Sequence, residues 1–195
     1  MEESTLRYYN SHAREYFDET VSADMRKTCD RFLKYVRLGG TIMDVGAGSG
    51  RDLKYFIERG YDAEGIDASE ELCIWASEYA GVSVDCVRIQ DWRPGRRYAG
   101  IWASASLLHL EMPEIEAFIR RLPALLEEGG AAYISLKSGI KTGMDEKGRY
   151  FTNVIERELQ AILDSVPELK IADKWDSDDT MRRRGFHWMN VILIS

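Results

Sequence analysis

The chain has 195 residues, 45% of them hydrophobic, which is enough for one domain with a full core. Its formal net charge of −7 at pH 7 argues against a nucleic-acid binder held by phosphate contacts. Arg182–Arg184 is the basic cluster that stands out, and a solvated loop is its simplest interpretation.

The cysteines and the apolar runs narrow the class further. Cys29, Cys73 and Cys86 lie far apart and form neither a zinc pattern nor a disulfide framework. We expect Cys29 and Cys86 to be small core residues. No apolar run approaches the roughly 20 residues that span a bilayer, and the acidic, polar N-terminus is not typical of a signal peptide. These features predict a cytoplasmic protein.

The first 38 residues are predicted to form two helices, because apolar side chains recur at helical spacing. Ser22 is the expected N-cap of the second helix, and Gly39-Gly40 ends it. The apolar positions are Leu6, Tyr9, Ala13, Tyr16 and Phe17 in the first helix and Met25, Cys29, Phe32 and Val36 in the second.

From residue 41 the pattern alternates between strands and helices. Ser69 and Pro113 are expected near helix starts, and Pro123 is expected to kink its helix. The polar loop 138–149 is predicted to be a mobile surface segment. The strands are predicted at 41–45, 63–66, 84–89, 101–105 and 131–136, with a final pair at about 169–175 and 186–194.

This alternation predicts an α/β fold, a doubly wound and mostly parallel sheet with helices on both faces. Only the loop 176–185 joins the last two strands, which is too short for a parallel crossover, so this pair is expected to be antiparallel. Ligands of such sheets bind beyond the carboxyl ends of the strands.

The segment Thr41–Asp52 runs from a strand through a glycine-rich turn into a helix. Gly46 and Gly48 fit the first two positions of the dinucleotide fingerprint G-x-G-x-x-G, but Arg51 stands where the third glycine belongs. Asp44, inside the strand, is a poor neighbour for pyrophosphate and a good one for a ligand that carries an ammonium group. The loop therefore indicates a cofactor other than a dinucleotide.

Two further acids end predicted strands. Asp67 follows the second strand, where a carboxylate can accept hydrogen bonds from ribose hydroxyls; the alternative is a helix N-terminal charge. Asp91 and Trp92 end the third strand, where a carboxylate can accept from an adenine amino group and a neighbouring side chain can cover the ring. The alternatives there are a turn acid and a core tryptophan.

The order of an N-terminal helical segment, Asp44–Gly50, Asp67, Asp91 and Ile101–Ser104 resembles the class I S-adenosylmethionine-dependent methyltransferases over nearly the whole chain. Gly50–Asp52 and Ala105–His109 resemble, more narrowly, small bacterial methyltransferases of the tellurite-resistance and thiopurine types. The resemblance implies one domain, with a helical lid at residues 1–38 and a Rossmann-like core of seven strands at 39–195.

The resemblance also implies S-adenosylmethionine as the cofactor and a small-molecule methyl acceptor, in a bacterial monomer or homodimer that binds neither nucleic acid nor membrane. Asp44 would orient the cofactor ammonium, Asp67 would hold the ribose, and Ser104 would approach the methionine moiety. The full implied cofactor set is Asp44, Gly46, Ala47, Gly48, Gly50, Asp67, Ala68, Asp91, Trp92 and Ser104.

Residues for the acceptor are harder to predict. His109 follows the fourth strand, where it can deprotonate or orient an acceptor; a polar residue at a helix start is the alternative. The candidates for a lid over the cofactor are Tyr9, His12 and Tyr16, and those for the pocket rim are Lys137, Arg149 and Trp188.

Three other functions stay open or are disfavoured. A domain that binds the cofactor without transferring a methyl group, and a methyltransferase for RNA or protein, both fit the residues. Arg51 and Asp44 disfavour a nicotinamide-dependent reductase. No Asn-Pro-Pro motif follows the fourth strand, which counts against methylation of amino groups in DNA, and no metal-ligand cluster is visible.

Overall fold

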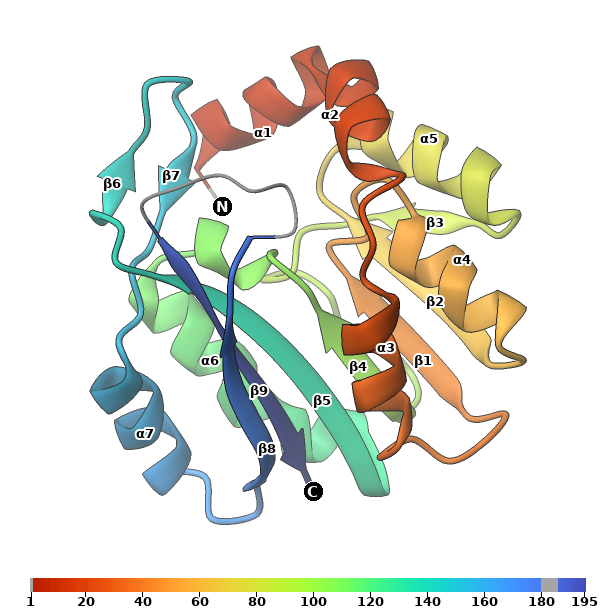
Figure 1. Ribbon diagram of the computed structural model, residues 1–195, viewed down its shortest axis with the longest axis vertical. Coiled ribbons are helices and arrows are strands. Elements are labelled where there is room, and N and C mark those ends of the chain that lie inside the picture. The colour runs from red at the N-terminus through yellow and green to blue at the C-terminus, as the bar shows by residue number, and fades with distance from the viewer. Residues whose placement is uncertain (1, 180–185) are drawn as a thin grey trace.

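The computed structural model describes residues 2–179 and 186–195, so the cluster Arg182–Arg184 lies outside the described residues. A seven-stranded sheet runs in the order β3-β2-β1-β4-β5-β9-β8 (Figure 1). Its strands are β1 (Thr41–Val45), β2 (Asp62–Asp67), β3 (Val84–Cys86), β4 (Tyr98–Ala103), β5 (Leu126–Ser138), β8 (Lys170–Ser177) and β9 (His187–Ile194).

The chain direction in this sheet is as predicted. Strands β1 to β5 pair in parallel, whereas β9 runs antiparallel to both of its neighbours, β5 and β8. In the β5–β9 pair, Ala131 lies opposite Ile194 and Ser138 lies opposite His187. The amino end of β9 therefore meets the carboxyl end of β5, so residues from both strands reach the edge of the sheet where ligands are expected.

Helices cover both faces of the sheet, because successive strand residues point to opposite sides and both sides are apolar. On one face Ile42, Trp102 and Tyr133 pack under α3, α4 and α5, and on the other Met43 and Ile101 pack under α6 and α7 (Figure 1). The helices are α3 (Arg26–Leu33), α4 (Arg51–Glu58), α5 (Glu70–Ala80), α6 (Met112–Leu125) and α7 (Glu156–Asp164).

The N-terminal helices depart from the prediction. The expected first helix is broken at His12 into α1 (Glu3–Ser11) and α2 (Ala13–Thr20), and the His12 ring hydrogen-bonds to the Tyr8 carbonyl. The second helix begins at Arg26 instead of following Ser22, because the Asp24 carboxylate accepts the Arg26 backbone N–H at 3.1 Å. Helices α1 and α2 lie across the carboxyl ends of the strands (Figure 1).

Two other expectations change. The third strand ends at Cys86, before a turn in which the Arg88 carbonyl accepts the N–H groups of Asp91 and Trp92. The thiol of Cys86 is consequently exposed, not part of the core. The loop 138–149, expected to be irregular, contains β6 (Gly143–Met144), which pairs with β7 (Tyr150–Phe151) in a small second sheet.

Three predicted helix features have different outcomes. Ser69 caps α5 by accepting the Leu72 N–H, and Pro113 lies in the first turn of α6, as predicted. Pro123 stands in the last turn of α6, which continues to Leu125, so a kink stays a prediction. In the part of the chain that the structure describes, every helix is too short or too polar to cross a membrane.

Candidate functional site

The glycine loop turns directly after β1. Gly46 and Gly48 have φ values of 83° and 56°, in the left-handed region that favours glycine. The N–H groups of Gly46 and Ala47 donate to the Ile66 carbonyl at 2.8 and 2.9 Å, which holds the loop against the end of β2. A Cβ on Gly46 would lie 2.4 Å from the Cβ of Ser106, so only glycine lets the two segments approach.

Gly50 has a different part in the loop. Its φ is 74°, and a Cβ there would lie 2.8 Å from the Ala76 carbonyl oxygen of α5. The residue lies in the wall of neither cavity described below. Gly50 thus sets the packing of the loop on α5, and the structure does not bring it to the predicted cofactor-lining position.

Two cavities flank the glycine loop. The smaller cavity, of about 50 Å³, lies toward β2 and contains Asp67, Ala68, Leu72, Ile89, Tyr9 and His109 in its wall. The larger cavity, of about 250 Å³, lies toward β5 and β9 and contains Asp44, Ala47, Ser49, Ser135, Trp188 and Asn190. Five residues line both: Tyr16, Gly46, Gly48, Ser104 and Ala105.

In the smaller cavity, the carboxylate of Asp67 is held by backbone donors. Oδ2 accepts the Gly48 N–H and Oδ1 accepts the Ser69 N–H, both at 2.9 Å. Burial raises the pKa of Asp67, and these N–H groups oppose that shift by favouring the charged form. The side chain therefore has a fixed position at the end of β2, next to the apolar surfaces of Ala68 and Ile89.

In the larger cavity, Asp44 is 2% exposed, and its Oδ2 has no hydrogen-bond partner among the described residues. Burial and the neighbouring Asp52 raise the pKa of Asp44 well above its usual value, and Arg51 opposes this. A buried carboxylate of this kind is costly unless a cation or a hydrogen-bond donor meets it. Asp44 is therefore suited to a positively charged ligand.

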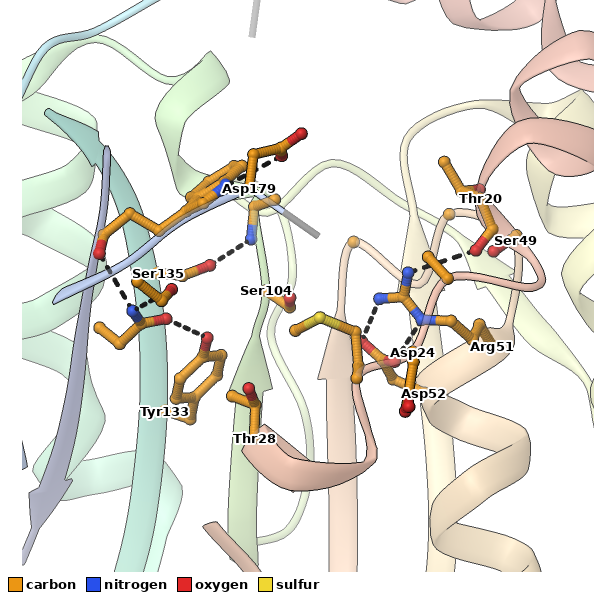
Figure 2. Close-up of a pocket in the computed structure, with 18 of the residues that line it drawn as sticks. Thr20, Asp24, Thr28, Ser49, Arg51, Asp52, Ser104, Tyr133, Ser135 and Asp179 are labelled. Carbon is orange, nitrogen blue, oxygen red and sulfur yellow. Dashed lines mark hydrogen bonds and ion pairs between the residues drawn. The ribbon is translucent and has the colours of Figure 1, made fainter. Parts of the chain in front are cut away.

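The loop also carries an ion pair that the sequence did not indicate. Arg51 binds both carboxylate oxygens of Asp52, at 2.6 and 2.8 Å, and its Nη1 donates to the Thr20 carbonyl of α2 at 3.3 Å (Figure 2). The indole Nε1 of Trp102 donates to Asp52 Oδ2 at 2.9 Å. Arg51 thus ties α2 to the sheet, a role that a third glycine could not have at this position.

The opposite wall of the larger cavity comes from β5, β8 and β9. Figure 2 shows Tyr133, Ser135 and Asp179 on the side facing Arg51 and Asp52. The Tyr133 hydroxyl donates to Asn190 Oδ1 at 2.7 Å, and Ser135 Oγ accepts the Ala105 N–H at 2.8 Å.

Among these wall residues, Tyr133, Ser135 and Asp179 escaped the sequence-based prediction. Trp188, which had been predicted, donates its indole N–H to Asp179 at 3.1 Å. The antiparallel direction of β9, which the sequence predicted, could have indicated that residues of β5 and β9 line the same cavity.

His109 lies in the wall of the smaller cavity, at the end of the short helix Leu107–His109. Its Nδ1 is 2.7 Å from the Tyr150 carbonyl oxygen, which can only accept, so Nδ1 carries the hydrogen. Nε2 is then the acceptor for the Tyr9 hydroxyl at 2.8 Å. Burial lowers the pKa of His109 to about 3, so the ring is neutral at neutral pH.

The lid helices rest on the sheet edge and on α5. Tyr16 contacts the glycine loop, since its ring lies 3.3 Å from where a Cβ of Gly48 would be. Phe17 packs against Trp75 and Tyr79 of α5, with ring centroids 5.4 and 5.6 Å apart. The predicted lid residues Tyr9 and Tyr16 therefore do reach the site.

The remaining predicted residues lie outside the walls of both cavities. Trp92 is buried against Tyr98 in the core, the alternative that the sequence left open, and Asp91 is exposed. His12 stacks on Tyr8. Lys137 lies over Phe151 and Trp188 and Arg149 pairs with Asp145, so both are held beside the site.

The sequence matches a known family. Residues 17–167, most of the chain, match the model of a methyltransferase domain family. The chain therefore belongs to that methyltransferase domain family.

Solved structures share the fold. The 1,6-didemethyltoxoflavin-N1-methyltransferase of Burkholderia thailandensis, solved with 1,6-didemethyltoxoflavin and S-adenosylhomocysteine, has a TM-score of 0.77 at 20% identity and covers 98% of this chain and 87% of its own. The magnesium protoporphyrin IX methyltransferase of Synechocystis PCC 6803, solved with bound S-adenosylmethionine, has a TM-score of 0.74 at 16% identity and covers 100% of this chain and 97% of its own. These matches confirm the predicted Rossmann-like methyltransferase fold.

The same fold also occurs with another named activity. The cyclase SpnF has a TM-score of 0.70 at 15% identity and covers 96% of this chain and 93% of its own. A search of curated proteins found no significant match. The fold by itself thus does not decide the reaction or the acceptor.

Proposed function

We propose that this protein is an S-adenosylmethionine-dependent methyltransferase that transfers a methyl group to a small molecule. The observation that carries the proposal is the pair of carboxylates on either side of the glycine loop. Asp67 is fixed by backbone donors in the smaller cavity, and the buried Oδ2 of Asp44 has no hydrogen-bond partner, among the described residues, in the larger one. S-adenosylmethionine has vicinal ribose hydroxyls for the first and a cationic amino acid end for the second.

The residues present fit this cofactor. Asp67 would accept the ribose hydroxyls, Ala68 and Ile89 would flank the adenine, and Asp44 would face the ammonium group. Ser104 and Gly46, which line both cavities, would lie beside the centre of the molecule. The wider cofactor set proposed from the family resemblance adds Ala47, Gly48, Gly50, Asp91 and Trp92, of which only Ala47 and Gly48 line a cavity.

The bound cofactor supplies a reactive sulfonium methyl group, so the chain's own residues chiefly align the acceptor and exclude water. Tyr9 and Tyr16 close the site from above. The neutral His109 holds Nε2 as a fixed acceptor behind the Tyr9 hydroxyl. With a pKa of about 3 it is a weak base in this closed arrangement, which favours an orienting role for His109 over proton removal.

We place the acceptor in the larger cavity, between the glycine loop and Trp188. Its wall offers hydrogen-bonding groups from Ser135 and Asn190 and an aromatic surface from Trp188. A cavity of about 250 Å³ suits a small molecule better than a macromolecule. The same proposal includes a single domain, a lid at residues 1–38, a bacterial cytoplasmic location and a monomer or homodimer.

Two measurements test this function. S-adenosylhomocysteine and S-adenosylmethionine should raise the melting temperature, because a ligand selective for the folded state adds about 2.7 kcal/mol at a hundred times its Kd. If neither compound raises the melting temperature at millimolar concentration while a nicotinamide cofactor does, the proposed cofactor is wrong. Labelled methyl transfer to a cell extract should then appear in the small-molecule fraction.

The second measurement also separates the alternatives. Label found only in RNA or protein would place the acceptor among macromolecules. Cofactor binding without any labelled product would favour a domain that holds S-adenosylmethionine without transferring its methyl group, and the cyclase SpnF shows that this fold carries another named activity.

A further inference from the structure

The turn Asp67–Ser69, which joins β2 to α5, lies against two thiols. Cys73, in the first turns of α5, has Sγ 3.5 Å from the Asp67 carbonyl oxygen. Cys86, at the end of β3, has Sγ 3.8 Å from the next carbonyl, that of Ala68. The strand register explains the second contact, because Cys86 lies directly beside Asp67 in the β2–β3 pair. Cysteines thirteen positions apart in sequence thus converge on one turn.

Both sulfurs lie within 3.8 Å of adjacent carbonyl oxygens of this one turn, and the two thiols differ in access. Cys86 is exposed, whereas Cys73 is 5% exposed beneath it. Burial also raises the pKa of the Cys73 thiol, which protects it from direct attack. The Cys86 thiol is therefore accessible to solvent, whereas the neighbouring Cys73 thiol is buried.

We propose that Cys73 and Cys86 form an oxidation site, in which a peroxide converts the two thiols to a disulfide and thereby weakens cofactor binding. The effect on binding rests on the function proposed above, whereas the formation of the disulfide does not. In a reducing compartment such a disulfide is transient, as expected of a redox-sensing pair.

The chemistry balances with one peroxide. The Cys86 thiolate attacks a peroxide oxygen, so that an S–O bond forms, the O–O bond breaks and the first water leaves. The Cys73 sulfur then attacks the Cys86 sulfur, the S–S bond forms, and the oxygen departs with a proton as the second water. Both thiols are oxidised, the peroxide is reduced, and a dithiol such as dithiothreitol reverses the reaction.

The effect on binding follows from what else the turn holds. Asp67 contacts the glycine loop through the Gly48 N–H, and the Ser69 hydroxyl donates to Asn10 of α1 at 2.6 Å. A disulfide withdraws both S–H groups from the turn and draws α5 and β3 together beneath it. The ribose-binding carboxylate and the lid are attached to the same three residues, so both are displaced.

The experiment compares the reduced protein with protein treated with hydrogen peroxide. Oxidation should remove two titratable thiols and the mass of two hydrogen atoms, and peptide mapping should find Cys73 joined to Cys86. Affinity for S-adenosylhomocysteine, measured by calorimetry, should fall about tenfold, the size of coupling between groups in contact, and return with dithiothreitol. Cys29, 1% exposed in a separate part of the structure, is the internal control for a thiol that stays reduced.

The variants Cys86→Ser and Cys73→Ser keep a hydrogen-bond donor at each position, and in both the affinity should no longer respond to peroxide. Oxidation of Cys86 to a sulfinic or sulfonic acid, or only intermolecular disulfides, would overturn the site. A correct disulfide with unchanged affinity would overturn the regulation. If the reduced protein binds no S-adenosylhomocysteine, the proposed function fails, and the mass and thiol measurements still decide the disulfide.

Discussion

The two cavities beside the glycine loop are built differently. The smaller cavity takes Asp67 from the end of β2, His109 from the short helix after β4 and Tyr9 from α1, and the backbone N–H groups of Gly48 and Ser69 fix the Asp67 carboxylate. The larger cavity collects Asp44, Ser135 and Trp188 from β1, β5 and β9, together with the segment between α2 and α3. Both walls join segments that are distant in sequence, but backbone donors fix the carboxylate in the first wall, whereas the second wall is built from side chains of several strands.

The cavities also differ in electrostatics. The carboxylate of Asp67 already has two backbone donors, whereas Oδ2 of Asp44 has no partner in the described residues. Asp67 is therefore preorganised for a neutral ligand group, and Asp44 carries an unrelieved desolvation cost. Asp67 therefore positions a ligand, whereas a ligand that meets Asp44 stabilises the protein. Mutations of the two carboxylates should consequently have different effects on affinity and on stability.

The largest effect is expected from Asp67→Ala. Loss of hydrogen bonds from a charged group costs about 1.5–3 kcal/mol each, so affinity for S-adenosylhomocysteine should fall by about a hundredfold in calorimetry. The melting temperature of the ligand-free protein should fall far less than this loss of affinity implies, because the variant frees the buried N–H groups of Gly48 and Ser69 but also removes a carboxylate that burial destabilises. Asp62→Ala, at the exposed opposite end of the same strand, is the matched control. Unchanged affinity in Asp67→Ala would remove Asp67 from the site.

Asp44→Asn should separate affinity from stability. The raised pKa of Asp44 means that its contribution to stability is greatest below its unfolded value, near 3.9, and is lost as the pH rises through the folded value. The ligand-free variant should therefore melt higher than the wild type at pH 8, with the difference vanishing near pH 4. Affinity should fall about tenfold with the loss of one charge-assisted contact. A variant that melts lower at pH 8 would show that Asp44 has a partner in the ligand-free protein.

The same contrast explains what the sequence could predict. The strands β1 and β2 and the Ser69 cap of α5 followed from local patterns in the sequence, and the ribose-binding role of Asp67 stays a prediction. Gly50 belongs to the glycine loop and Trp92 follows Asp91 at the end of the predicted third strand. In the structure, however, Trp92 is buried in the core and Gly50 packs on α5. A residue type at a strand end does not reveal which way its side chain points.

Other features were beyond prediction because they are non-local. The ion pair of Arg51 with Asp52 links α2 to the sheet only because the fold places the Thr20 carbonyl of α2 beside Arg51. Tyr133 and Ser135 of β5 share the larger cavity with Trp188 of β9 because the two strands pair antiparallel. The acceptor therefore stays a proposal, although the fold that surrounds it was predicted correctly.

His109 gives a smaller, pH-dependent effect. Its pKa is lowered to about 3 by burial, so below pH 6.5 the unfolded chain binds a proton that the native protein does not. Wild-type stability should fall as the pH drops from 6.5 toward 3, by about 1 kcal/mol at about pH 5.5, and His109→Gln should lose this part of the slope. Nuclear magnetic resonance should show no titration of His109 between pH 7 and 5. A midpoint near 6.5 would mean that the ring is accessible and can serve as a base.

Trp188→Ala is expected to change cofactor binding least. The indole lies in the wall of the larger cavity and not of the smaller one, and its N–H donates to Asp179. Affinity for S-adenosylhomocysteine should stay within about twofold of the wild type, because none of the proposed cofactor contacts comes from Trp188. Labelled methyl transfer to the small-molecule fraction should nevertheless fall, since the acceptor loses its aromatic surface. If the variant lost cofactor affinity and transfer in equal measure, Trp188 would contact the cofactor itself, and the placement of the acceptor beside Trp188 would be wrong.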